Sequence, residues 1–82
     1  MTLKEFINKE KELHNLVGFN LELKVKNLQT STRYTIDLNA HEIFGFLNAL
    51  HCTDYISSEV WEGLFDDTQK IQNETYRKLW NL

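Results

Sequence analysis

Carboxylates are the most abundant reactive side chains in the second half of the sequence. Between Arg33 and Lys70 the chain has no Lys or Arg, and it carries seven acids: Asp37, Glu42, Asp54, Glu59, Glu62, Asp66 and Asp67. Paired carboxylates can act as general acid and base, but the acid needs a pKa raised by burial in a cleft. Glu59, Glu62 and Asp66 fall opposite the apolar side of a predicted helix, in water. We therefore expect no acid–base catalysis from them.

The remaining reactive side chains follow no catalytic or metal-binding pattern. His51 and Cys52 are neighbours, and neighbouring side chains at a helix end point in different directions, whereas a nucleophile needs an oriented base. Zinc ligands cluster at short spacings, but His14, His41 and His51 are widely spaced. The three glycines are isolated, so a phosphate-binding loop is not present. We expect no enzyme activity, metal or cofactor, and a buried Cys52.

The composition is that of a small globular domain. The chain has 82 residues, of which 41% are hydrophobic and 26% charged, so it can form one apolar core. A single cysteine excludes an intrachain disulfide. The first residues lack the apolar segment of a secretory signal, and apolar runs fall short of the about 18 residues of a membrane span. We expect one domain over residues 1–82, located in the cytoplasm and not bound to a membrane.

A capping box marks the start of a first helix. Thr2 and Glu5 have the spacing at which each side chain accepts a hydrogen bond from the backbone N–H of the other. Apolar residues follow at near-helical spacing, and Gly18 suits a left-handed helix end. We predict a helix over about residues 3–16.

Two alternating segments predict a β-hairpin. In residues 19–25 every second residue is apolar, and residues 34–38 follow the same period of two, which is typical of a strand with one buried face. The polar residues between them predict a loop. A two-stranded sheet is barely stable alone, so helices must cover its apolar face.

Two further helices complete the predicted order. One covers about residues 40–51 after a capping-box pattern at Asn39 and Glu42, and a longer one begins after a cap at Ser57 or Ser58. Its apolar side comprises Trp61, Leu64, Phe65, Thr68, Ile71, Gln72, Thr75, Tyr76, Leu79 and Leu82. Its opposite row comprises Glu59, Glu62, Asp66, Lys70, Asn73 and Arg77, with Asp67 and Glu74 at the edge. Gly63 lies inside this helix, where we expect a tolerated glycine; the alternatives are a bend or a close approach by a neighbour.

The predicted fold class is therefore α+β, a single small domain in the order α-β-β-α-α. An antiparallel β-hairpin packs against three helices. The predicted core comprises Phe19, Leu21, Leu23, Val25, Tyr34, Ile36, Leu38, Phe44, Leu47, Leu64, Phe65 and Ile71.

Charge divides the chain into two unlike parts. Residues 1–36 have a net charge of +2 and residues 37–82 a net charge of −5. Acids near a helix start interact favourably with its dipole, but this does not account for Asp66 and Asp67, and Glu62 repels Asp66 at i,i+4. The acids therefore form either an ordinary solvated face or a patch that imitates nucleic-acid phosphates. Tyr55 and Trp80 are candidate aromatic anchors beside such a patch.

In its size, its lack of Pro, its many Asn and Lys residues and its predicted acidic helical pair, the chain resembles small phage-encoded anti-CRISPR proteins. The resemblance covers the whole chain in outline. It implies an inhibitor that blocks a nuclease of a host defence system, in some members by placing acidic side chains in the cleft that reads the target motif. This group shares no diagnostic motif, so residue roles are not transferred.

The expected function is therefore binding to a protein partner, a nucleic-acid-binding nuclease, without direct contact to nucleic acid. The contact residues expected from the sequence are Asp37, Glu42, Asp54, Tyr55, Glu59, Glu62, Asp66, Asp67 and Trp80. The alternative is a structural or homo-oligomeric interaction module, with a possible homodimer formed through an apolar helix side or a free strand edge. A transcription regulator would need direct DNA binding, which the acidic second half disfavours.

Overall fold

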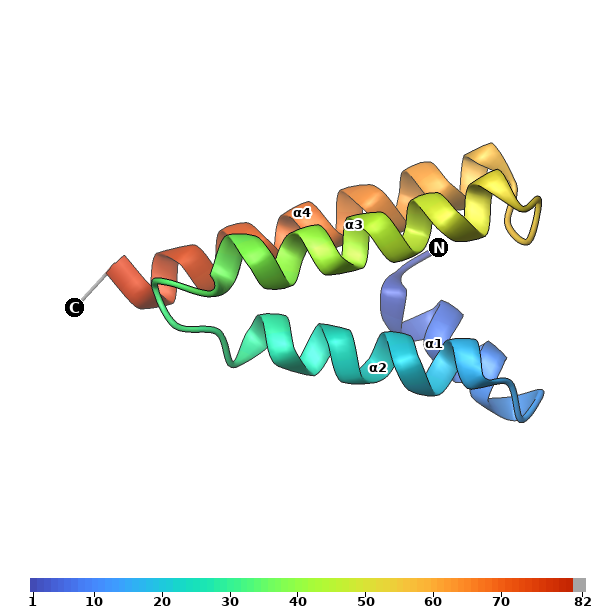
Figure 1. Ribbon diagram of the computed structural model, residues 1–82, viewed down its shortest axis with the longest axis horizontal. Helices are drawn as coiled ribbons and strands as arrows, with labels where there is room; N and C mark the ends of the chain where they lie inside the picture. The colour runs from blue at the N-terminus through green and yellow to red at the C-terminus, as the bar shows by residue number, and fades with distance from the viewer. Residues whose placement is uncertain (81–82) are drawn as a thin grey trace.

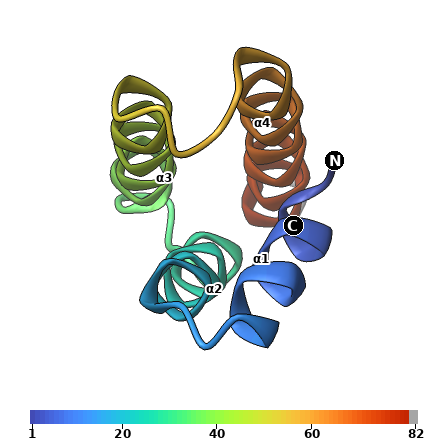
Figure 2. The same cartoon turned by 90° about the vertical axis from the view of Figure 1, so that its right-hand side faces the viewer.

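Four helices follow one another along the chain in the computed structural model, which describes residues 1–80 (Figure 1). They are α1 (Leu3–Glu12), α2 (Leu16–Gln29), α3 (Ile36–Cys52) and α4 (Ser58–Trp80). The helix α3 runs antiparallel to both α2 and α4, and the short α1 lies across one end of α2 (Figures 1 and 2). The described part of the chain contains no strand, so the predicted α+β class is wrong and the fold is all-α.

The predicted first strand, residues 19–25, lies within α2. Its apolar residues recur at every second position, and in a helix such a set divides between two opposite faces. Leu21 is fully buried and Val25 is half-buried, whereas Phe19 and Leu23 are exposed. The alternation that indicated one buried strand face therefore marks a helix with an inner and an outer apolar face.

The predicted second strand, residues 34–38, divides in the same way. Tyr34 lies in the turn before α3 and is 97% exposed. Ile36 begins α3 and is buried, and Leu38 in the first turn of α3 points outward. The helix thus begins earlier than the predicted start at residue 40, because Ile36 is the first residue of its buried side. The further buried residues on this side are Ala40, Ile43, Leu47 and Leu50.

The first helix begins as predicted but ends earlier. The Thr2–Glu5 capping box is formed, with the Glu5 N–H donating to Thr2 Oγ1 and the Thr2 N–H donating to Glu5 Oε1, both at 3.1 Å. The chain leaves α1 through His14, which has a left-handed φ of 53°. Asn15 then caps α2, because its Oδ1 accepts from the Val17 N–H at 3.1 Å. The predicted helix over 3–16 therefore ends at Glu12, and a tight turn leads to α2, which begins at Leu16.

Gly18 was predicted to end the first helix, but it lies inside α2 without a positive φ. Its role is close packing. A Cβ at this position would lie 2.9 Å from both Glu10 Cβ and the Lys11 backbone N of α1. The missing side chain lets α2 cross α1 at short range.

The core lies between the four helices. Its buried apolar residues are Leu3, Phe6, Ile7, Leu21, Leu28, Ile36, Ala40, Ile43, Leu47, Leu50, Ile56 and Leu64. The predicted core residues Val25, Phe44 and Ile71 pack against it partly buried, and Phe65 is half-buried beside Phe44. Phe19, Leu23, Tyr34 and Leu38 do not belong to it. Along α3 and α4 the core continues as aromatic contacts, with the Phe44 and Phe65 ring centroids 4.4 Å apart.

The two faces of α4 follow the sequence prediction. Ser57 caps the helix through its Oγ, which accepts from the Val60 N–H at 3.2 Å. Thr68 and Thr75 are buried on the apolar side because their hydroxyls donate to the carbonyls of Leu64 and Ile71, at 2.8 Å each. The predicted polar row from Glu59 to Arg77 is exposed, Tyr76 is more exposed than expected, and Leu82 lies outside the described residues.

Gly63 lies where the N-terminal segment passes over α4. A Cβ on Gly63 would meet the Met1 backbone O at 3.2 Å and N at 3.4 Å. One turn later on the same face, Asp67 Oδ2 accepts a hydrogen bond from the Leu3 N–H at 2.8 Å. The two residues together fix the start of α1 against α4, so Gly63 marks a close approach.

Candidate functional site

The acids predicted to form one patch are distributed over different parts of the surface. Asp37 lies in the first turn of α3, and its Oδ1 accepts from Gln72 Nε2 at 3.2 Å. Glu42 is on α3 with its Oε2 4.0 Å from Lys24 Nζ. Asp54 lies in the loop after α3 in a left-handed conformation, with φ 60°. Asp37 therefore contacts α4 through Gln72, Glu42 lies beside α2, and Asp54 lies in the loop between α3 and α4.

On α4 the acids themselves separate into two kinds. Glu59, Glu62 and Asp66 are exposed along the outer side of the helix. Asp67 is half-buried and turned towards α1, where it binds the Leu3 N–H. The outer row therefore holds three of the seven predicted acids, and further along it continues with the basic Lys70 and Arg77.

The two predicted aromatic anchors are held by their own chain. Tyr55 accepts a hydrogen bond from Asn15 Nδ2, and a hydrogen bond to the Glu10 carboxylate raises the Tyr55 pKa above its usual value. Trp80 stacks on Tyr76 with ring centroids 4.4 Å apart, and the Arg33 guanidinium lies 5.3 Å from the Trp80 centroid. These contacts connect loops and helix ends of the fold.

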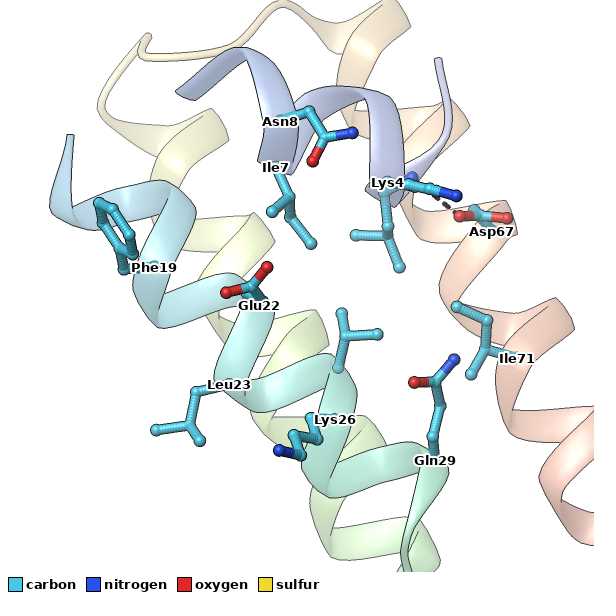
Figure 3. A pocket seen from close by; sticks show the side chains of 12 residues that line it. Lys4, Ile7, Asn8, Phe19, Glu22, Leu23, Lys26, Gln29, Asp67 and Ile71 are labelled. Carbon is cyan, nitrogen blue, oxygen red and sulfur yellow. Dashed lines mark hydrogen bonds between the residues drawn. The ribbon is translucent and has the colours of Figure 1, made fainter. Parts of the chain in front are cut away.

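A groove that the sequence analysis did not predict lies between α1, α2 and α4 (Figure 3). Its volume is about 640 Å³. It is lined by Leu3, Lys4, Ile7, Asn8, Phe19, Glu22, Leu23, Val25, Lys26, Gln29, Asp67 and Ile71. Leu3 and Ile7 belong to the core, so the groove opens directly onto the hydrophobic interior.

Apolar side chains extend from the groove onto the outer face of α2. Phe19 is 47% exposed, Leu23 59% and Leu16 74%, and their i, i+3, i+7 spacing places them along one side of the helix. Lys11 covers part of this side, with its Nζ 5.3 Å from the Phe19 ring centroid. An exposed apolar stripe of this kind is typical of an interaction surface. When residues 16–29 are read as one helix, their apolar side chains fall on two opposite faces. This pattern is the sequence signal that could have located the exposed stripe.

The groove has a polar rim in which the acids are already bound. Glu22 forms an ion pair with Lys11 at 2.9 Å, and Asp67 accepts from the Leu3 N–H. Lys4 and Lys26 also line the groove, and within residues 1–80 neither forms an ion pair. With Lys11 included, the charges at the rim sum to +1, because three lysines stand against Glu22 and Asp67.

His51 and Cys52, adjacent in the sequence, have different surroundings in the fold. The His51 ring stacks on Trp61 with centroids 5.4 Å apart, and its Nε2 is 2.9 Å from Ser58 Oγ. Cys52 is exposed rather than buried as predicted. Among the described residues, His, Cys, Asp and Glu do not gather in any group of three or more able to hold a metal ion.

Over residues 1–80, each helix is too short or too polar to cross a membrane. Comparisons of the chain with protein-family models, with curated proteins and with solved structures give no significant match.

Proposed function

We propose that this protein is a non-catalytic interaction module that binds an amphipathic helix of a partner protein in the groove between α1, α2 and α4. One observation carries the proposal: an apolar groove opens onto the core and continues outward through the exposed Phe19 and Leu23. Water-exposed apolar surface of this kind is stabilised by covering it with another apolar surface.

Helix lengths explain why a helix suits this groove. The 10 residues of α1 extend about 15 Å, whereas the 23 residues of α4 extend about 35 Å. The short α1 therefore leaves much of the length of α4 without a neighbour on this side. All three walls are helices, and a further helix packs between two helices through ridges and grooves.

The energetics favour a modest affinity. Complete burial of a Phe or Leu side chain contributes about 1.5–3 kcal/mol. Phe19 and Leu23 are already about half buried, so covering both contributes about 2 kcal/mol. The partner must therefore also place its own apolar side chains over Val25 and Ile71, which line the groove.

A peptide-binding experiment tests this function. An uncharged amphipathic helical peptide, with Leu at i, i+3, i+4 and i+7 and Gln elsewhere, is labelled and titrated by fluorescence anisotropy. Leu23→Ser should weaken binding several-fold, because it removes apolar surface at the rim. Leu38→Ser is the matched control, since Leu38 is similarly exposed on α3 and does not line the groove. Equal binding by the two variants, or no binding by the parent protein, would contradict the proposal.

A second candidate function rests on the outer row of α4. Glu59, Glu62 and Asp66 are exposed on one rigid helix, and within residues 1–80 they form no ion pair. Such a row can engage a basic cleft, which supports the anti-CRISPR-like role, inhibition of a nucleic-acid-binding nuclease in the cytoplasm. If this is the function, reversing the three charges to Lys should abolish inhibition of DNA cleavage by an RNA-guided nuclease. Asp67 is left unchanged in that variant because it binds α1.

A further inference from the structure

We propose that the groove selects an acidic partner helix, one with Asp or Glu beside its apolar side chains. The inference rests on the proposed function and specifies the chemistry of the ligand. It follows from the charged residues that surround the groove and from the ion pairs that some of them already form.

Two lysines at the groove have no ion pair within residues 1–80. Lys4 comes from α1 and Lys26 from α2, so they reach the groove from different helices (Figure 3). Both residues are exposed, and within residues 1–80 neither has a carboxylate partner. A helix lying along the groove would therefore meet an ammonium group from each of two walls.

The acids at the groove leave an excess of one positive charge when Lys11 is counted with Lys4 and Lys26 against Glu22 and Asp67. Glu22 is held by Lys11 at 2.9 Å, and this pair adds no net charge. Asp67 is held at 2.8 Å by the Leu3 N–H, at the positive end of the α1 dipole. An incoming carboxylate finds ammonium donors at Lys4 and Lys26, whereas an incoming cation finds Glu22 paired with Lys11 and one oxygen of Asp67 bound by α1.

A second copy of this chain suits the groove less well than a different protein. Its acidic row, Glu59 to Asp66, is on α4, but the apolar side of α4 is buried in its own core at Leu64 and Thr68. Its exposed apolar stripe is on α2, where Lys24 and Lys26 are the nearest charged neighbours of Leu23 on the C-terminal side. On α2 the one carboxylate, Glu22, is already paired with Lys11, and on α4 the acidic row lies opposite the buried apolar side.

Three peptides on one helical template test the charge preference. They share the Leu positions and carry Glu, Gln or Lys at the flanking positions, and their affinities are measured at low and at high salt. We expect the Glu peptide to bind about tenfold more tightly than the Lys peptide at low salt, because two exposed pairs each change affinity a few-fold. The difference should shrink at high salt through screening.

Charge reversal in the protein provides the decisive comparison. Lys4→Glu with Lys26→Glu should reverse the preference, so that the Lys peptide binds best. The control with the same net charge is Lys9→Glu with Lys78→Glu, because these exposed lysines do not line the groove and should leave the order unchanged.

The possible outcomes distinguish the preference for an acidic helix from the helix-binding function on which it rests. If none of the three peptides binds, the proposed helix-binding function fails. If all three bind equally, or if both double variants behave alike, the acidic preference is wrong while groove binding stands. Self-association of the protein without peptide, abolished by Leu23→Ser in sedimentation, would assign the groove to a second copy and overturn the inference.

Discussion

Gly18 sets how closely α1 and α2 can approach, and it provides a sharp test of that contact. Gly18→Ala would place a Cβ 2.9 Å from the Lys11 backbone N, which cannot move aside like a flexible side chain. Overpacking of this kind costs about 1–3 kcal/mol, more than the gain of about 1 kcal/mol in helix propensity. We expect Gly18→Ala to lower the free energy of unfolding in urea denaturation.

Gly45 is the matched control for this substitution. It is an exposed residue inside α3, and a Cβ there would meet nothing within 4 Å. Gly45→Ala should therefore stabilise the protein by about 0.5–1 kcal/mol. Equal effects of the two substitutions would contradict the close crossing of α1 and α2.

Asp66 and Asp67 are adjacent and of the same type, but they have different roles. Asp67→Ala removes the acceptor for the Leu3 N–H at the start of α1, and such a loss costs about 0.5–2 kcal/mol. Asp66→Ala changes an exposed side chain and should stay within about 0.5 kcal/mol. Thermal and urea unfolding of both variants measure the difference. An Asp66→Ala effect as large as that of Asp67→Ala would show that the contact with α1 contributes nothing.

Tyr55 connects the loop before α4 to the end of α1 and gives a pH-dependent signature. Its hydrogen bond to Glu10 raises the Tyr55 pKa above 10.0. When folding raises the pKa of a group, that group stabilises the fold fully at pH values below its pKa in the unfolded chain. This stabilisation is lost as the pH rises through its pKa in the folded protein. Wild-type protein should therefore lose stability above about pH 10, and Tyr55→Phe should lack this component. Parallel unfolding curves for the two proteins from neutral to alkaline pH would contradict the contact.

At the scale of elements, α2 shows where sequence periodicity is insufficient. The spacing of apolar residues located α4 and its polar row, because one face is buried and the other is in water. In α2 both faces carry apolar residues, and a period of two in residues 19–25 fits a strand as well as a two-faced helix. Burial of only one of these faces depends on tertiary packing against α1, α3 and α4, which local patterning does not specify.

NMR chemical shifts give a direct test of this correction. The Cα secondary shifts of residues 19–25 should be positive, as in a helix, because these residues lie inside α2. A strand would give negative values. Positive values should continue from Leu16 to Gln29. A break in the positive values between Glu12 and Leu16 would also confirm the turn between α1 and α2. Negative values in this segment would contradict the fold.

At the scale of the whole molecule, the groove arises from unequal helix lengths. The long α4 and the short α1 share one side of a molecule 40 Å long, so part of that side lacks a covering helix. The residue types predicted an acidic surface of seven carboxylates. Three of them, Glu59, Glu62 and Asp66, share one exposed row on α4. The sequence alone does not assemble the groove, because its residues come from three helices and four of them, Phe19, Glu22, Leu23 and Val25, fall in the segment whose alternation predicts a strand.

Mapping the bound peptide onto the protein tests the central claim most directly. In a ¹H–¹⁵N NMR titration with the Glu peptide, the account predicts that the largest shift changes fall on Ile7, Leu23, Lys26 and Ile71, which line the groove from three helices. Residues of α3 such as Leu38 and Glu42 should change little. Changes centred on the outer row of α4, or none at saturating peptide, would contradict the assignment of the groove as the binding site.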